Sequence, residues 1–262
     1  RVMLARSVAT EACRRASNGA EFVARVYRET GIKLDVIAAQ EEARLAVLGC
    51  HSLLEQGDGP ALIFDIGGGS TELVVVETEN GQPTILDWQS APWGVVSLTE
   101  ASAHHGQSET GRQRAYEEMR GHVREAFASF AARLPARHAV RLLGTSGTVT
   151  TLASLHLELP QYDRRAVDGL IVPAGSMRSL SQRIAGMSPP ERRAQPCIGR
   201  ERSDLVVAGC AILETILDLW PADRLGVADR GIREGILRGL IAAGDEGERS
   251  RAALRRARRT NA

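Results

Sequence analysis

The fold is decided by one stretch, Ala61-Leu62-Ile63-Phe64-Asp65-Ile66-Gly67-Gly68-Gly69-Ser70-Thr71-Glu72-Leu73-Val74-Val75-Val76-Glu77. Its first six residues are almost all apolar, which predicts a buried strand. Residues 72–77 are rich in β-branched side chains, which favour a second strand. The three glycines and the serine between them predict a tight turn, so the stretch is expected to fold as strand, turn and strand.

The same stretch carries candidate chemistry. Asp65 ends an apolar strand, where a carboxylate is costly without a partner. The backbone N–H groups of Gly67, Gly68, Gly69 and Ser70 can approach an anion closely and surround phosphate oxygens. Because Asp65 and Glu72 would repel a phosphate, we expect them to hold Mg²⁺ between themselves and it. An ordinary glycine-rich hairpin remains the alternative.

Composition places few limits on function. The chain has 262 residues, 43% of them hydrophobic and 25% charged, which is typical of a globular protein. A net charge of +1 gives no general reason to expect nucleic acid or an acidic membrane as a partner. The four cysteines lack metal-ligand spacing. No signal peptide or apolar run of membrane-spanning length is visible, so we expect a cytoplasmic protein.

The remaining elements predict an α/β class. Helices are expected over 20–30, 41–55, 109–134, 149–157, 205–219 and 232–243, and strands over 1–8, 34–38, 84–90, 140–143 and 225–228. Residues 10–16 are expected to form a loop that leads into a helix. Hairpin and crossover connections both occur in this order, which predicts a sheet of mixed direction.

A second glycine-containing loop, Gly144-Thr145-Ser146-Gly147-Thr148, follows a strand and opens a helix. This arrangement points N–H groups and the positive helix end at an anion. The alternative is an ordinary helix cap, which Ser and Thr also supply. Competing phosphate motifs are absent: no GxxxxGK[ST] occurs, and a strand rather than a helix follows Gly69.

Two further charged positions have both a structural and a functional interpretation. Glu41 and Glu42 open a predicted helix, where they balance the helix dipole or provide a general base aimed at water. Arg14 is either part of a surface ion pair or a phosphate clamp.

Taken together and in order, these motifs resemble the exopolyphosphatase / guanosine pentaphosphate phosphohydrolase (Ppx/GppA) family of the actin-like ATPase and sugar kinase superfamily. The resemblance rests on four segments: Glu41-Glu42-Ala43-Arg44, Asp65 to Glu72, Gly144 to Thr148, and Asp229-Arg230-Gly231-Ile232-Arg233-Glu234-Gly235. It implies an α/β, actin-like (ribonuclease H-like) two-domain fold with mixed sheets and an active site between the domains.

The resemblance also implies roles. Glu42 matches the catalytic base, and Asp65 and Glu72 match carboxylates that hold Mg²⁺ or another divalent cation. Arg14 matches an arginine that reaches the phosphate chain from the other domain. The two loops match the phosphate loops, and the segment from Asp229 to Gly235 is expected to be mainly structural. The implied substrates are inorganic polyphosphate and pppGpp. A homodimer is suggested by the family alone.

One departure from the family concerns the start of the chain. A further phosphate loop of the form Asp-x-Gly-Ser-Asn-Ser is absent, so we expect a short form whose first domain is incomplete. Residues 1–45 are expected to belong to that domain, 46–244 to the second, and 245–262 to a disordered tail. An actin-like kinase or ATPase and a non-catalytic polyphosphate- or alarmone-binding module remain the alternative functions.

Overall fold

The computed structural model describes residues 4–79, 81–102, 108–134, 140–200 and 202–244. The strands are β1 (Ser7–Ala9), β2 (Leu34–Val36), β3 (Ala61–Ile66), β4 (Thr71–Glu79), β5 (Gln82–Ala91), β6 (Arg141–Thr145), β7 (Ile171–Pro173) and β8 (Arg224–Ala228). The helices are α1 (Glu11–Arg15), α2 (Gly19–Thr30), α3 (Ala39–Cys50), the 3-10 helix η1 (His51–Leu53), α4 (Val95–Ala101), α5 (Glu109–Arg133), α6 (Gly147–His156), α7 (Arg164–Val167), α8 (Ala174–Gly186), α9 (Pro189–Arg193) and α10 (Val206–Leu219), followed by a helix over residues 232–244, named here helix 232–244.

The centre of the molecule is a six-stranded sheet of order β5-β4-β3-β6-β8-β7. The short turn after Ile66 returns the chain at once, so β3 and β4 pair antiparallel, and β5 pairs antiparallel with β4. Helical crossovers bring β6 beside β3 and β8 beside β6 in parallel. The predicted mixed-direction α/β sheet is therefore confirmed.

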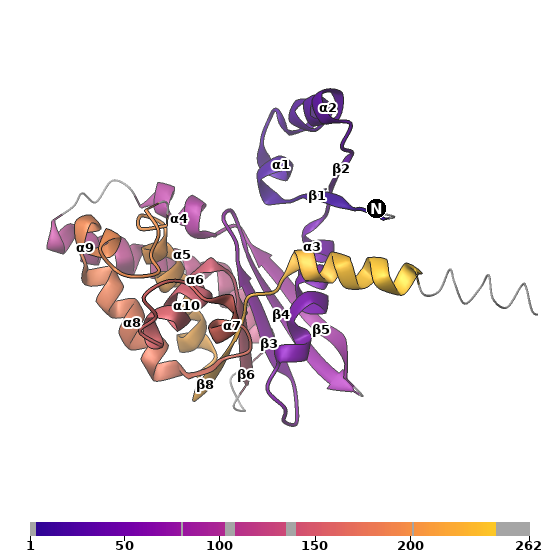
Figure 1. Cartoon of the computed structure of the whole chain (residues 1–262). Coiled ribbons are helices and arrows are strands. Elements are labelled where there is room, and N and C mark those ends of the chain that lie inside the picture. The colour runs from indigo at the N-terminus through magenta and orange to yellow at the C-terminus, as the bar shows by residue number, and fades with distance from the viewer. Residues whose placement is uncertain (1–3, 80, 103–107, 135–139, 201, 245–262) are drawn as a thin grey trace, which may run out of the picture.

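Helices cover both faces of this sheet (Figure 1). Alternate residues of a strand point to opposite faces, and β3 uses both. Leu62 and Phe64 pack into the large core formed with α5, α6, α8 and α10, whereas Ala61 and Ile63 pack against α3 on the other face. Burial on both faces explains why β3 is apolar without alternation.

A small N-terminal unit stands apart from the sheet and is joined to it through α3 (Figure 1). It consists of the parallel pair β1 and β2 with α1 and α2. The strand expected over residues 1–8 is shorter, Ser7–Ala9, and a five-residue helix, α1, replaces part of the expected loop. Residues 1–3 and 245–262, which include the tail expected to be disordered, lie outside the described residues.

The predicted domain boundary at residue 45 falls inside α3, whose inner face packs on the large sheet.

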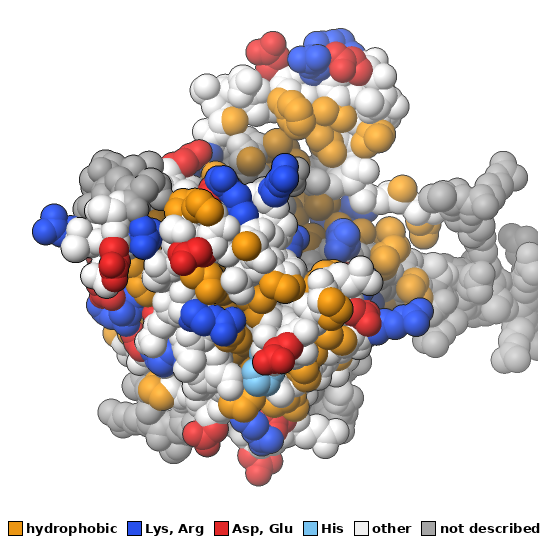
Figure 2. Space-filling view, turned by 60° about the vertical axis from the view of Figure 1, so that its left-hand side comes forward, with side chains coloured by type: hydrophobic (Ala, Val, Ile, Leu, Met, Phe, Trp, Pro, Cys, Tyr) orange, Lys and Arg blue, Asp and Glu red, His pale blue; other side chains and the backbone are white. Residues whose placement is uncertain are grey.

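The apolar stripe of α2 in the small unit is not buried, since the side chains of Phe22 and Tyr27 are 49% and 59% exposed. Figure 2 shows hydrophobic side chains on this unit where it faces the rest of the molecule.

Helix 232–244 crosses α3 at backbone contact. A Cβ atom on Gly49 of α3 would lie 2.0 Å from the carbonyl oxygen of Gly231. A Cβ atom on Gly235 would lie 2.0 Å from the carbonyl oxygen of Leu45. Glycine is required at both positions, and the crossing fixes α3 beside the carboxyl end of β8. Among the described residues, no helix combines the length and hydropathy needed to cross a membrane.

Candidate active site

Three carboxylates meet where α3 approaches the sheet. Asp65 is the penultimate residue of β3 and lies opposite Glu72 of β4 in the antiparallel register, and Glu42 lies in the first turn of α3. Burial, followed by the charges of Glu72 and Glu42, raises the pKa of Asp65 to about 8. Burial and the charge of Glu42 raise the pKa of Glu72 to about 7. The charges of the three groups thus oppose one another's ionisation.

The hydrogen bonds of this group leave carboxylate oxygens available. The hydroxyl groups of Ser70 and Ser90 both donate to Oε1 of Glu72, each at 2.8 Å. Asp65 receives no side-chain hydrogen bond from the described residues. A partly buried carboxylate without a donor is costly, and a bound cation would remove that cost. Asp65 and Glu72 thus fit a Mg²⁺ site, for which oxygen ligands are required.

The set of ligands from the protein is small. No group of three or more His, Cys, Asp or Glu side chains able to hold a metal ion occurs within the part of the chain that the structure describes. Two carboxylates leave most of an octahedral shell to water and substrate oxygens. That division is typical of Mg²⁺ bound together with phosphates.

Arg14 links Glu42 to the small unit. Its Nη1 donates to Oε2 of Glu42 at 2.9 Å and to the carbonyl oxygen of Ile37 at 2.7 Å. Its Nε and Nη2 both donate to Oε2 of Glu11, at 3.0 and 2.7 Å. Burial raises the pKa of Glu42, although Arg14 opposes that shift. The predicted phosphate contact of Arg14 would require exchange of one of these carboxylates, and it stays a prediction.

The turn between β3 and β4 presents N–H groups on one side. The first N–H groups of α4, from Val95 and Val96, donate to the carbonyl oxygens of Gly67 and Gly68 at 2.9 and 2.8 Å. The C=O and N–H of a trans peptide point in opposite directions, so the N–H groups of Gly68 and Gly69 face away from α4. These two N–H groups have no acceptor among the described residues. Backbone N–H groups in this orientation are able to bind an anion.

Only some residues of the second loop, Gly144 to Thr148, face the cleft. Gly144 lies inside β6, where a Cβ atom would come within 2.6 Å of the Phe64 ring, so its role is packing rather than phosphate binding. The hydroxyl of Thr145 donates to the carbonyl oxygen of Arg230 at 2.7 Å. Thr148 packs against Gly209 of α10, where an added Cβ would meet its Oγ1 at 2.1 Å. The cleft-facing part of the loop is therefore centred on residues 145–147.

Ser146 is strained. It adopts φ 129° and ψ 171°, a region that is essentially restricted to glycine. Its hydroxyl is buried and has no hydrogen-bond partner among the described residues. Backbone strain of this kind clusters at functional sites, and here it directly precedes Gly147, the first residue of α6.

The two loops meet around Arg202. A cleft of about 540 Å³ is lined by Asp65, residues 145–147, Arg202 and residues 229–233. A neighbouring hollow of about 180 Å³ is lined by Gly67 and Gly68 from the first loop, Gly147 and Thr148 from the second, and again Arg202. The Arg202 guanidinium lies over Gly147, since a Cβ there would be 3.1 Å from its Cζ.

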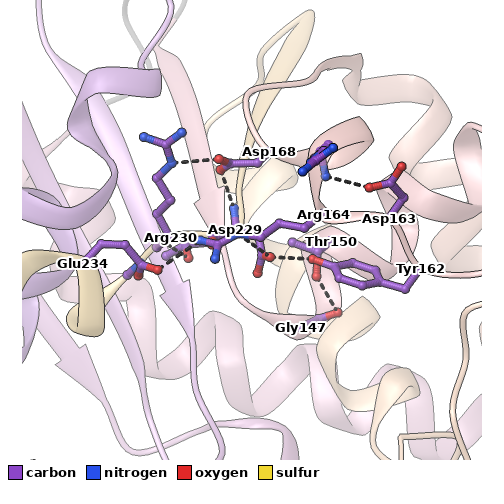
Figure 3. Close-up of polar contacts among 12 residues, drawn as sticks. Gly147, Thr150, Tyr162, Asp163, Arg164, Asp168, Asp229, Arg230 and Glu234 are labelled. Carbon is purple, nitrogen blue, oxygen red and sulfur yellow. Dashed lines mark hydrogen bonds and ion pairs between the residues drawn. The ribbon is translucent and has the colours of Figure 1, made fainter.

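The wall of the cleft after β8 is a polar network (Figure 3). Tyr162 donates its hydroxyl to Asp229 at 2.6 Å, and Arg164 forms an ion pair with the same carboxylate at 3.1 Å. Arg230 donates from Nε to Asp168 at 2.7 Å. The segment expected to be mainly structural therefore also lines the cleft. Sequence reasoning missed Tyr162 and Arg202, which lie in a stretch without a recognisable motif.

The chain belongs to the Ppx/GppA phosphatase family, whose model matches residues 2–243. It is 30% identical over 240 residues to exopolyphosphatase 2 of Mycobacterium tuberculosis. That alignment covers 88% of this chain and 73% of the relative.

Solved structures agree with the family. The Ppx/GppA member from Aquifex aeolicus superposes with a TM-score of 0.72 at 29% identity, over 91% of this chain and 74% of its own. An exopolyphosphatase from Cytophaga hutchinsonii superposes with a TM-score of 0.78 at 24% identity, over 91% and 75% of the two chains, and supports the fold alone. The actin-like fold that the sequence predicted is thereby confirmed.

Proposed function

We propose that this protein is a Mg²⁺-dependent hydrolase that releases the terminal phosphate of inorganic polyphosphate by direct attack of water. The proposal rests chiefly on the convergence of Glu42, Asp65 and Glu72 beside a glycine turn with free N–H groups. Membership of the Ppx/GppA phosphatase family supports it, as does similarity to a protein named exopolyphosphatase 2.

Asp65 and Glu72 are the residues that would hold Mg²⁺. Each is buried enough for its pKa to be raised, which means that the apo site disfavours two negative charges. When bound, Mg²⁺ supplies positive charge that neutralises the terminal phosphoryl group. Ser70 and Ser90 fix the Glu72 carboxylate through Oε1 and leave Oε2 without a hydrogen bond from the described residues.

Glu42 is the proposed general base. A carboxylate with a pKa raised by burial accepts a proton from water more readily than an exposed one. Arg14 holds the carboxylate in position through Oε2. Glu42 would orient water and take its proton as the terminal phosphate leaves the chain.

The N–H groups of Gly68 and Gly69 and the guanidinium of Arg202 would bind the phosphate oxygens. The two N–H groups are held by the turn before the substrate arrives, which is the arrangement that stabilises developing negative charge most effectively. Arg202 is exposed and has no ion-pair partner among the described residues, so its donors are available.

The test is a side-by-side measurement of phosphate release from polyphosphate and from pppGpp, with Mg²⁺ and with EDTA. We expect Mg²⁺-dependent release from polyphosphate. Faster release from pppGpp would assign the pentaphosphate as the preferred substrate. Binding without release would favour a non-catalytic module, and transfer from ATP to a sugar would favour an actin-like kinase.

A further inference from the structure

The glycine turn between β3 and β4 is held on one side by the segment that follows β5. We name residues 93–97, which lead into α4, the turn clamp. The N–H groups of Val95 and Val96 in this segment donate to the carbonyl oxygens of Gly67 and Gly68, at 2.9 and 2.8 Å. The C=O groups of both glycines therefore point toward the turn clamp.

These two C=O groups determine where the proposed phosphate donors point. The C=O of Gly67 shares a peptide plane with the N–H of Gly68, and the C=O of Gly68 shares the next plane with the N–H of Gly69. Because each plane is rigid, a hydrogen bond that fixes its C=O also fixes the direction of its N–H. The turn clamp thus sets the orientation of both N–H groups from the opposite side of the turn.

Gly94 allows this close contact. A Cβ atom on Gly94 would lie 2.5 Å from the carbonyl oxygens of Gly67 and Gly68, where the atoms would overlap. Its own backbone does not require glycine, since φ −123° and ψ −176° lie in the extended region that alanine adopts freely. The requirement for glycine therefore comes from the turn, which a methyl group at this position would displace.

Hydrogen bonds from side chains hold the turn clamp on both sides of Gly94. The N–H of Gly94 donates to Oγ of Ser97 at 2.9 Å. The Ser97 hydroxyl lies 3.3 Å from the carbonyl oxygen of Gly69, one of three carbonyl oxygens to which it can donate. On the other side, Thr71 donates its hydroxyl to the carbonyl oxygen of Trp93 at 2.7 Å. The clamp is thus joined both to the turn and to the start of β4.

We propose that Gly94 is a positioning residue for the phosphate-binding N–H groups of Gly68 and Gly69. The inference rests on the proposed function and adds to it a residue outside the groups that would contact metal or substrate. Donors stabilise developing charge best when they are oriented beforehand, because turning them during the reaction costs energy. The close contact at Gly94 supplies that constraint.

The experiment uses Gly94→Ala, with Gly121→Ala as the matched control because nothing lies within 4 Å of a Cβ atom at that position of α5. Kinetics on polyphosphate with Mg²⁺ are combined with amide NMR spectra of Gly68 and Gly69 during titration with inorganic phosphate. We expect Gly94→Ala to lower kcat by about 10–100-fold, which is less than the loss of a whole oxyanion donor. Its phosphate-induced amide shifts should shrink, whereas Gly121→Ala should behave as wild type. Lower stability alone would leave the amide shifts of the folded molecules unchanged.

A second variant covers the case in which Gly94→Ala does not fold. Ser97→Ala removes the hydroxyl that accepts the N–H of Gly94, and we expect smaller amide shifts and a kcat lowered about threefold to tenfold, as for one lost hydrogen bond. Thr99→Ala is its control, since the Thr99 hydroxyl donates to the carbonyl oxygen of Val95 inside α4. That control should retain the kcat and the amide shifts of wild type.

The outcomes separate this inference from the proposed function. If wild type releases phosphate but Gly94→Ala, or Ser97→Ala in its place, keeps the wild-type kcat and amide shifts, the positioning role alone is wrong. Equal losses in a variant and its control also overturn it. If wild type releases no phosphate, but its two amides respond to phosphate and respond less in the variant, only the hydrolase proposal fails. If the wild-type amides do not respond to phosphate, the positioning role fails whatever the turnover.

Discussion

Asp65 and Glu72 face one another across adjacent antiparallel strands. Like charges at directly opposite positions destabilise a sheet. The Glu72 side chain is buried and Asp65 is partly buried at the edge of the cleft, and the raised pKa values of about 8 and about 7 express the resulting cost. The fold thus retains an unfavourable pair at the point where a divalent cation would be bound, as expected where function opposes stability.

Replacing Asp65 by Asn should therefore stabilise the metal-free protein. A carboxyl group with a pKa above its unfolded value destabilises the fold at neutral pH, and Asn removes that penalty. We expect the free energy of unfolding at pH 7 to rise by about 1–3 kcal/mol in urea titrations without Mg²⁺. Phosphate release should be lost. A less stable variant that retains turnover would contradict both the repulsion and the assigned role.

Glu41, which directly precedes the proposed base, has a lowered pKa, whereas the pKa of Glu42 is raised. Hydrogen bonds from Arg44, and then from Arg6, lower its pKa from 4.5 to about 2. The stabilisation is fully present above pH 4.5 and is lost as the pH falls through about 2. Glu41→Gln should therefore cost about 1 kcal/mol at pH 7 and less at pH 3. Urea unfolding at the two pH values checks this, and a cost that does not fall with pH would refute it.

At the scale of elements, the crossing of α3 and helix 232–244 depends on glycine. Gly235→Ala would place a methyl group against the carbonyl oxygen of Leu45, and we expect a loss of about 1–3 kcal/mol. Gly239→Ala is the matched control in the same helix, because nothing lies within 4 Å of its added Cβ. Alanine there should stabilise the helix by up to about 1 kcal/mol. Equal effects in chemical denaturation would show that the crossing is looser than described.

The sequence predicted those elements that have strong local patterns. The apolar run 61–66 and the β-branched run 72–77 became β3 and β4, because burial and β-propensity act in the same direction there. The helix α1 was missed because five residues carry hardly more than one helical turn of pattern. Gly144 was wrongly predicted to belong to a phosphate loop. It packs against the ring of Phe64, which comes from a distant part of the chain, so no local pattern reveals this contact.

At the scale of the molecule, the site is assembled from several segments. The sequence gives their order along the chain but not how they pack against one another in space. Glu42, Asp65 and Glu72 were predicted because each stands beside a recognisable motif. Arg202 was not, since its position over Gly147 depends on how the segment before α10 packs against α6. The excess of arginine in the region 159–202 was the available signal, but composition alone does not place a side chain.

The small unit and the sheet are joined through the proposed base itself. Arg14 of α1 bonds to Glu42 of α3, and Arg6 bonds to Glu41 of the same helix. Figure 2 shows basic side chains along the boundary between the two units. The cleft between Glu11, Arg15 and the glycine turn lies at that boundary. The proposed chemistry therefore depends on the position of one unit relative to the other.

The most direct test of the proposed mechanism is the turnover of Glu42→Gln on polyphosphate with Mg²⁺, with Glu41→Gln as the neighbouring control. Removal of a general base should lower kcat by about 10²–10⁴-fold. We predict a loss in that range for Glu42→Gln, little change in KM, and near wild-type turnover for Glu41→Gln. Retained turnover in Glu42→Gln, or an equal loss in both variants, would contradict the role assigned to Glu42.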